Sequence, residues 1–164
     1  CIDTLEHVPN DHQALREATK TLKKGGLALF YVPCANPLNL EWLVSKVSET
    51  NFFPRDKEQF HLHRYKTDKI VSLLKICAFD LLKITYFLHY FSSFFDLLGS
   101  WYDRKSIKGR RPHIPKLFLE LIFFIERVEY KVLHSLPFAA GMFILCKKSD
   151  VEPTIQSFTT SNAP

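Results

Sequence analysis

Residues Cys1 to Pro33 read CIDTLEHVPNDHQALREATKTLKKGGLALFYVP, and this stretch decides the fold. Helix signals mark both ends of residues 10–24. Asn10 can cap the segment with Gln13 three residues on, and a lysine-rich last turn precedes Gly25-Gly26, the pattern of a helix C-terminus. The continuous apolar run Leu27–Val32 predicts a strand buried on both faces, ending at Pro33. The stretch therefore predicts the end of a strand, a helix and a buried strand, which form a βαβ unit.

Three linked motifs in this stretch carry a family resemblance. They are TLEHVP at residues 4–9, ALRE followed by TLKKGG within residues 14–26, and Val32-Pro33. In this order and spacing they resemble the class I S-adenosyl-L-methionine (SAM)-dependent methyltransferases, and most closely the small-molecule and quinone-biosynthesis branch. Lys24 stands where that family often has proline. The resemblance implies an α/β fold, with a Rossmann-like seven-stranded sheet and an antiparallel last strand.

Two cofactor-binding motifs of that family are not in this chain. They are the glycine-rich turn after the first strand and the acidic residue that ends the second strand, and the resemblance places Cys1 inside the fourth strand. We therefore expect the chain to be the C-terminal portion of a longer methyltransferase, and not to bind SAM appreciably or act by itself. The alternatives are a catalytically silent methyltransferase-like subunit that binds a partner, and a membrane-surface or RNA-binding module. The upstream sequence would decide between the enzyme and the silent subunit.

The rest of the chain continues the alternation of helices and strands. Helical periodicity predicts helices over residues 39–50, 66–77 (with Thr67 as its cap) and 116–134. We expect Leu27–Val32, Leu81–Tyr90 and Phe138–Cys146 to share one sheet, with the last strand antiparallel. Residues 1–148 would form the methyltransferase portion, with an insertion over residues 91–136. Residues 149–164 have the composition of a disordered tail.

The positive charge of the chain is concentrated in one segment. Residues 104–116 hold six Lys and Arg and no acid, whereas the net charge of the whole chain is +5, so the remainder carries −1. This distribution makes nucleic acid an unexpected partner. The four cysteines form no C-x-x-C pair, and we expect reduced thiols in a cytoplasmic protein.

An aromatic cluster precedes the basic segment, over residues 91–102. Its commonest interpretation is ordinary core, and the alternatives are a lid over an apolar substrate or a surface that rests on a membrane. The basic residues of 104–116 favour the last two, because anionic headgroups attract such segments. RNA binding would also suit basic and aromatic residues, but no RNA-binding motif is present. The apolar half of the following helix is far shorter than the roughly 20 residues that span a bilayer.

Ligands of open α/β sheets bind beyond the carboxyl ends of the strands, here near residues 4–8 and 33–36. The resemblance implies that Thr4 and Leu5 pass beside the methionine part of SAM, and that Glu6 and His7 look toward a small or lipid-like acceptor. His7 is the candidate general base, since an imidazole pKa suits the task. A purely structural role for Glu6 and His7, holding the loop, is the commoner alternative.

Four further residues are expected to line the substrate pocket: Pro33, Asn36, His61 and Tyr65. His63 is expected in a solvated loop. His61 and His63 would share a face in an extended segment, but no third ligand is placed beside them by the sequence. We therefore expect no metal site.

Overall fold

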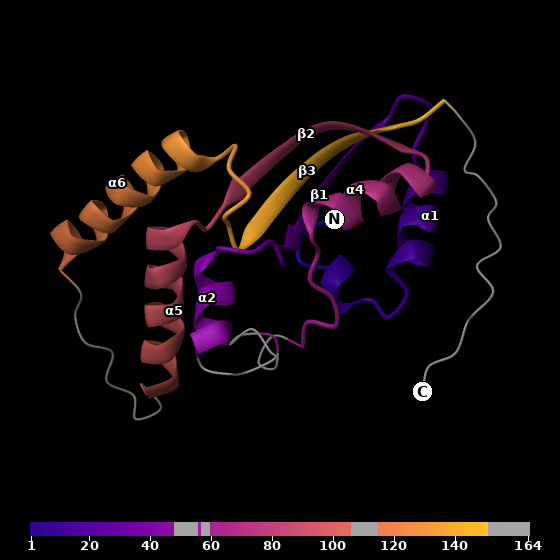
Figure 1. Cartoon of the computed structure of the whole chain (residues 1–164). Coiled ribbons are helices and arrows are strands. Elements are labelled where there is room, and N and C mark those ends of the chain that lie inside the picture. The colour runs from indigo at the N-terminus through magenta and orange to yellow at the C-terminus, as the bar shows by residue number, and fades with distance from the viewer. Residues whose placement is uncertain (48–55, 57–59, 106–114, 151–164) are drawn as a thin grey trace, which may run out of the picture.

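A computed structural model of the chain describes residues 1–47, 56, 60–105 and 115–150, with 47 and 99–105 described by their backbone alone. It is an α/β fold around a three-stranded sheet of strand order β1-β3-β2 (Figure 1). The strands are β1 (Leu27–Pro33), β2 (Phe79–Phe87) and β3 (Gly141–Lys148). The helices are η1 (Leu5–His7), α1 (Asp11–Thr21), α2 (Leu40–Val47), α4 (Thr67–Ile76), α5 (Tyr90–Lys105) and α6 (Lys116–Leu133).

The sheet confirms the predicted strand arrangement. β3 pairs antiparallel with both β1 and β2, so β1 and β2 run in the same direction. Both later strands differ from the prediction in their bounds. β2 ends at Phe87 because Leu88 has a left-handed backbone (φ 57°), and Tyr90 already begins α5. β3 begins at Gly141 rather than Phe138 and runs on to Lys148.

Helix α1 forms where its end signals predicted it. The Asn10 side chain accepts a hydrogen bond from the backbone N–H of Gln13 at 2.9 Å. The helix ends at Thr21, and Gly25 supplies the left-handed turn (φ 70°) that leads into β1. Leu15 is buried on its inner face.

The two faces of β1 differ in burial, so the prediction of a strand buried on both faces was wrong. Phe30 and Val32 belong to the core, whereas Leu27 is 60% exposed and Leu29 is 45% exposed. The reason is that the described helices cover only part of the outer face of the sheet.

On the edge that does not pair with β3, β1 exchanges backbone hydrogen bonds with Cys1 through Leu29 and Tyr31, the pattern of a parallel pair. Cys1 therefore pairs with β1 in the parallel sense.

Helix α4 takes its cap from a distant loop, and the prediction that Thr67 caps it was wrong. Thr67 is the first helical residue, and its N–H donates to Oδ1 of Asn36 at 3.0 Å. Ile70 and Leu74 pack into the core, which also contains Phe79, Met142, Ile144 and Cys146. Asn36 thereby joins the loop after β1 to the helix before β2.

Helices α5 and α6 lie between β2 and β3 in the chain, and with α2 they gather beyond the carboxyl ends of β1 and β2 (Figure 1). Glu129 of α6 joins the two helices. Its carboxylate accepts hydrogen bonds from the N–H of Phe91 at 2.7 Å and of Ser92 at 2.9 Å, at the N-terminus of α5. No helix among the described residues is long and apolar enough to cross a membrane. The basic residues 104–114 and the predicted tail beyond residue 150 lie outside the described side chains.

Candidate functional site

A cavity of about 600 Å³ opens beside the carboxyl end of β1. Residues from the first turn, from β1 and from the segment after α2 reach it, as expected for a site at this edge of a sheet. Its polar lining consists of Asp3, Glu6, His7, His61 and Asp96, and Pro33 lies among its apolar lining. Among the described residues that line it there is no Lys or Arg. The cavity is therefore acidic, and it suits a positively charged guest.

Glu6 is the most unusual residue of this lining. It is fully buried, and neither carboxylate oxygen has a hydrogen-bond partner among the described residues. The short helix η1 holds it there, because the neighbouring Leu5 is anchored in the core. The Glu6 carbonyl oxygen accepts hydrogen bonds from the N–H groups of Leu62 at 2.8 Å and His63 at 3.2 Å. These bonds dock residues 60–65 against η1.

This docking places His61 beside His7 across 54 positions of sequence. Their ring centroids lie 5.1 Å apart, and ligand atoms of Glu6, His7 and His61 all lie within 4.8 Å of one another. Nδ1 of His7 is 3.2 Å from the carbonyl oxygen of Phe60, and Nδ1 of His61 is 3.2 Å from Oδ1 of Asp56. A carbonyl oxygen and a carboxylate oxygen only accept hydrogen bonds, so Nδ1 carries the hydrogen in each ring. In the neutral imidazole, Nε2 then has the lone pair.

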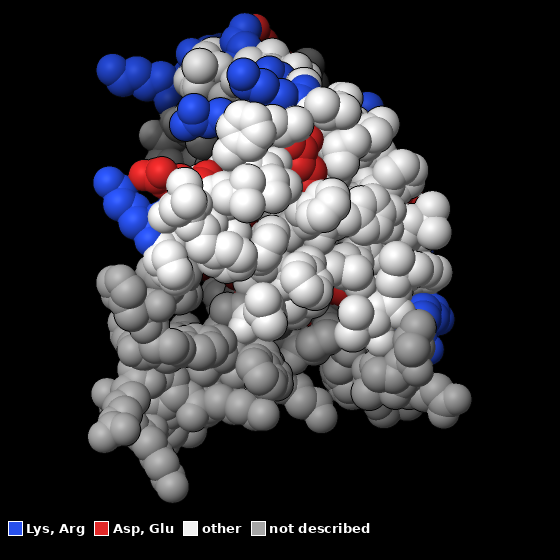
Figure 2. All heavy atoms as spheres, turned by 90° about the vertical axis from the view of Figure 1, so that its left-hand side faces the viewer, with Lys and Arg blue, Asp and Glu red and all other residues white. Residues whose placement is uncertain are grey.

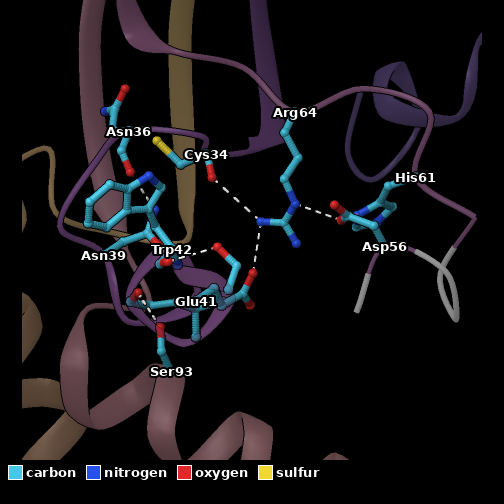
Figure 3. Close-up of polar contacts among 11 residues, drawn as sticks. Cys34, Asn36, Asn39, Glu41, Trp42, Asp56, His61, Arg64 and Ser93 are labelled. Atoms are coloured by element: carbon cyan, nitrogen blue, oxygen red, sulfur yellow. Dashed lines mark hydrogen bonds and ion pairs between the residues drawn. The ribbon is translucent and has the colours of Figure 1, made fainter. Parts of the chain in front are cut away.

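An ion-pair network stands behind His61, as Figure 3 shows. Arg64 Nε donates to the same Asp56 oxygen at 2.6 Å, and Arg64 Nη1 lies 2.8 Å from Glu41 Oε2. Glu41 and Ser45 are the buried residues of α2, whereas Leu40, Leu43 and Val44 are half-buried. Helical spacing alone had predicted that the apolar side of this helix is the buried one. The network fixes Asp56, and Asp56 in turn orients the His61 ring.

Three aromatic rings form the opposite wall of the cavity. Tyr31, Phe87 and Phe143 come from the three strands, with centroid separations of 4.9–5.2 Å. A side chain at Gly141 would collide with this wall, because a Cβ there would lie 2.7 Å from Tyr31 Cε2 and 2.8 Å from Phe87 Cε1. Burial, followed by the negative charges of Asp3, Glu6 and Glu41, raises the pKa of Tyr31. Tyr31 is therefore a neutral phenol rather than a base.

The predicted site residues divide into two groups. Glu6, His7, Pro33 and His61 line the cavity together. Asn36 and Tyr65 do not: Asn36 bonds to Thr67 and to the Pro137 carbonyl, and the Tyr65 hydroxyl donates to Asp11 at 3.1 Å. Tyr65 is buried in the core cluster. For these two residues the structure favours a structural role.

Three other residues of the predicted site complete the comparison. Thr4 is exposed and bonds to the Ile2 carbonyl, while Leu5 is in the core, so any contact of these residues with a cofactor stays a prediction. His63 is half-buried rather than solvated, and its Nε2 donates to the Val8 carbonyl oxygen at 3.0 Å. Sequence reasoning paired His61 with His63 and so missed the Glu6-His7-His61 cluster. The adjacent Glu6-His7 pair was the available signal.

A second surface feature lies on the α5–α6 hairpin. Side chains that are neither acidic nor basic cover much of this side of the molecule, with Lys and Arg toward its margins (Figure 2). Phe91 and Phe94 of α5 are more than half exposed, and Phe123 and Phe124 of α6 are each 64% exposed. An apolar groove of about 350 Å³ runs between Phe91, Phe124, Val128 and Val132. Phe91 and Phe94 are therefore not core residues, as the commonest interpretation of the cluster had it, whereas Trp101 and Tyr102 lie outside the described side chains.

Comparison with known proteins identifies the fold. No family model matches the chain, and no curated protein matches it. A solved SAM-dependent methyltransferase from Thermotoga maritima, described as a possible histamine N-methyltransferase, is similar over 90% of this chain and 54% of its own, with a TM-score of 0.50 and 15% identity. Phosphoethanolamine N-methyltransferase 2 of Haemonchus contortus, solved with SAM, is similar over 90% of this chain and 32% of its own, with a TM-score of 0.45 and 12% identity. The chain thus has a methyltransferase-like α/β fold and spans about half the length of the first of these proteins.

Proposed function

We propose that this chain is the C-terminal portion of an enzyme that transfers a methyl group from SAM to a small or lipid-like acceptor. The observation that carries the proposal is the position of the Glu6-His7-His61 cluster. It lines a cavity at the carboxyl end of β1, within a fold shared with a SAM-dependent methyltransferase. Ligands of open α/β sheets bind at this edge.

The acidic cavity fits one end of SAM. Its sulfonium and ammonium groups are cationic, and the cavity offers the carboxylates of Asp3 and Glu6 with an aromatic wall, a combination that attracts cations. The chain contains neither a glycine-rich turn nor an acidic strand end to hold the adenosine part. We therefore assign to this chain the methionine end and the acceptor side only.

The cofactor supplies the methyl group as a good electrophile, so the protein must align the acceptor and accept its proton. The rings of Tyr31, Phe87 and Phe143 can hold an apolar body of the acceptor against the sheet. The imidazoles of His7 and His61 line the same cavity, and a ligand atom of each lies within 4.8 Å of the Glu6 carboxylate. These groups are the ones that can act on an acceptor hydroxyl or amine.

The test uses the full-length protein that carries this chain. Incubation with methyl-labelled SAM and mixtures of small hydroxyl, amine and prenylated acceptors should give a labelled product. The Glu6→Gln variant should lose at least about 100-fold in kcat/KM, the range of general-base and positioning effects, whereas Lys20→Gln on the exposed face of α1 should not. SAM binding without transfer to any acceptor would instead support the silent subunit. Micromolar binding of SAM to the 164-residue chain alone would contradict our placement of the cofactor site.

We further propose that the α5–α6 hairpin rests on an anionic membrane or on an amphiphilic acceptor. Its exposed aromatic side chains and its apolar groove support this, and the basic residues of 104–116 connect its two helices in sequence. Anionic lipids attract such segments by about 1 kcal/mol per basic residue near the surface. The groove suits a hydrocarbon chain rather than a polar headgroup, because its described lining is almost wholly apolar.

Vesicle binding tests this second proposal. Replacing Leu117, Phe123 and Phe124 with Gln should weaken binding to phosphatidylcholine vesicles that contain phosphatidylserine, measured by co-sedimentation. Each removed side chain contributes about 1.5–3 kcal/mol if it enters the apolar layer. Leu82→Gln is the matched control, since Leu82 is 52% exposed on β2. Neutralising Arg104, Lys105, Lys108, Arg110 and Arg111 should remove the preference for phosphatidylserine and leave SAM affinity unchanged. Equal binding by all these variants would contradict the proposal.

A further inference from the structure

We propose that Glu6, His7 and His61 bind a divalent first-row transition-metal ion, with zinc as the reference ion. This inference deepens the proposed function, because the ion would lie where the acceptor binds. It differs from the sequence-based expectation of no metal site. Two imidazoles and one carboxylate form a known set of zinc ligands that leaves one coordination position open.

The first step of the argument is the unmet charge requirement of Glu6. Its carboxylate is fully buried, and its oxygens have no hydrogen-bond partner among the described residues. Burying an ionised carboxylate without a partner is strongly unfavourable. In the described part of the chain, no Lys or Arg lines the cavity to compensate for it. A bound cation would provide the compensation.

The second step is the orientation of the two imidazoles. His7 donates from Nδ1 to the Phe60 carbonyl oxygen, and His61 donates from Nδ1 to Asp56. Both rings therefore keep the Nε2 lone pair that a metal requires. Hydrogen bonding of the second nitrogen to a carbonyl or carboxylate is the usual support of a metal-binding histidine.

The third step is the rigidity of that support. Asp56 is held by Arg64 at 2.6 Å, and Arg64 is held in turn by Glu41 at 2.8 Å (Figure 3). The side chains of Arg64 and Glu41 are 8% and 4% exposed. The Glu6 carbonyl oxygen, through Leu62 and His63, ties the same segment to η1. A site with ligands in place before the ion arrives loses little freedom on binding.

The nature of the ligands favours a transition metal over magnesium. Mg²⁺ prefers oxygen ligands, whereas imidazole suits zinc, iron and nickel. An ion on three protein ligands could bind an acceptor hydroxyl at its open position toward the cavity. The O–H bond would then break with release of the proton to solvent, because the ion lowers the hydroxyl pKa. His7 would act as a ligand in place of the general base that its sequence context indicated.

Metal binding can be measured without any activity assay. The untagged full-length protein in a Cys1→Ser background is dialysed against chelator and titrated with Zn²⁺ by calorimetry, then with Co²⁺ by visible absorption. We expect one ion per chain and cobalt bands typical of low coordination. His61→Ala and Glu6→Gln should each weaken the dissociation constant by more than about 100-fold, and Asp56→Asn by about 10- to 100-fold. The matched control, His63→Ala, should bind like the parent, since His63 Nε2 is occupied by the Val8 carbonyl oxygen.

Three results would overturn the inference. One is the absence of zinc and cobalt binding to protein that is folded by circular dichroism. Another is binding that His61→Ala leaves unchanged. The third is binding of tetramethylammonium that is lost in Glu6→Gln and kept in His61→Ala, which would assign the cavity to an organic cation. Methyl transfer by a protein that binds neither zinc nor cobalt would leave the proposed function standing while the metal site fails. Tight metal binding without methyl transfer would support the metal site and contradict the proposed function.

Discussion

Single residues set the shape of the candidate site, and Gly141 is the clearest case. It lies at the start of β3, opposite Pro33 of β1 and Phe87 of β2. Because it has no Cβ, the rings of Tyr31 and Phe87 meet above it. Its backbone is not in the left-handed region, so the requirement for glycine is one of space alone. This residue controls the aromatic wall without contacting a ligand.

We expect Gly141→Ala to destabilise the fold by about 1–3 kcal/mol, the usual cost of overpacking. The new Cβ would lie 2.7–2.8 Å from atoms of both rings, so the rings must move. Urea unfolding followed by far-UV circular dichroism measures the loss. Adding Tyr31→Ala should recover part of it, because the Tyr31 ring contributes two of the three close contacts. Additive losses in the double variant would contradict the steric explanation.

At the scale of single residues, the sequence predicted hydrogen bonds between near neighbours in the chain. It missed those between residues far apart in the chain. The Asn10 cap was predicted because its partner, Gln13, is three positions away. The Asn36 cap of α4 was not, because its partner lies 31 positions on. Asn36 was expected at the substrate pocket because it follows the end of a strand, and Thr67 was given the capping role that Asn36 performs.

Among the elements, α6 depends on a polar contact as much as on burial. Much of its apolar surface is exposed, and Glu129 joins it to the N-terminus of α5. A carboxylate at a helix N-terminus satisfies free N–H groups and interacts favourably with the helix dipole. The Ser92 hydroxyl adds a third hydrogen bond, at 2.5 Å. Glu129 is therefore the residue that most specifically positions the hairpin.

Glu129→Ala should destabilise the protein by about 3 kcal/mol, since hydrogen bonds to charged groups contribute about 1.5–3 kcal/mol each and do not add fully. Chemical denaturation monitored by tryptophan fluorescence and circular dichroism is the measurement. Glu120→Ala on the same helix is the control. Its side chain is 59% exposed beside Lys116, so its loss should cost no more than about 0.5 kcal/mol. Equal effects of the two substitutions would contradict the capping role.

Element types followed well from periodicity, and element limits followed less well. The helices at residues 11–21, 67–76 and 116–133 and the three strands are where the patterns predicted them. The end of β2 was placed three residues too late, because nothing in the composition of Leu88 signals its left-handed backbone. The exposure of Leu27 and Leu29 was also missed, since an apolar run does not reveal which face is covered.

At the scale of the whole molecule, three buried thiols make the free energy of unfolding fall at alkaline pH. Burial raises the pKa of Cys34, Cys77 and Cys146 to about 11, from an ordinary value of 9. The unfolded chain therefore releases these protons at lower pH than the folded chain does. The contribution to stability is complete below about pH 8.5, where unfolded thiols are still protonated, and it is lost as the pH rises toward 11.

We expect the urea midpoint to fall between pH 8 and pH 10.5. A Cys34→Ala, Cys77→Ala, Cys146→Ala variant should show a smaller fall, although its stability at pH 8 is lower. Cys1, which is exposed, serves as an internal reference: iodoacetamide should modify it in the folded protein and reach the other three thiols only after unfolding. An identical fall in the variant would assign the effect to other groups.

The sequence predicted the sheet better than the site. The reason is the separation in sequence between the residues that each depends on. The fold follows from alternating local patterns, each readable within about ten residues. The cluster of Glu6, His7 and His61 depends on contacts across 55 positions, from Glu6 to His61, which no local pattern encodes. A motif resemblance located the first two residues, and the sequence placed His61 at the substrate pocket, but only the folded chain brought His61 beside them.

The strand order β1-β3-β2 also has a consequence for synthesis on the ribosome. In the described sheet, β1 and β2 do not pair with each other. Each of them pairs with β3, at residues 141–148. During translation, two apolar strands therefore emerge with unpaired edges well before the strand that joins them. Such edges are the usual sites of misassembly in a nascent chain. A protein of this topology depends on the last strand arriving promptly, and slow decoding between residues 88 and 141 would prolong its exposure to chaperones and proteases.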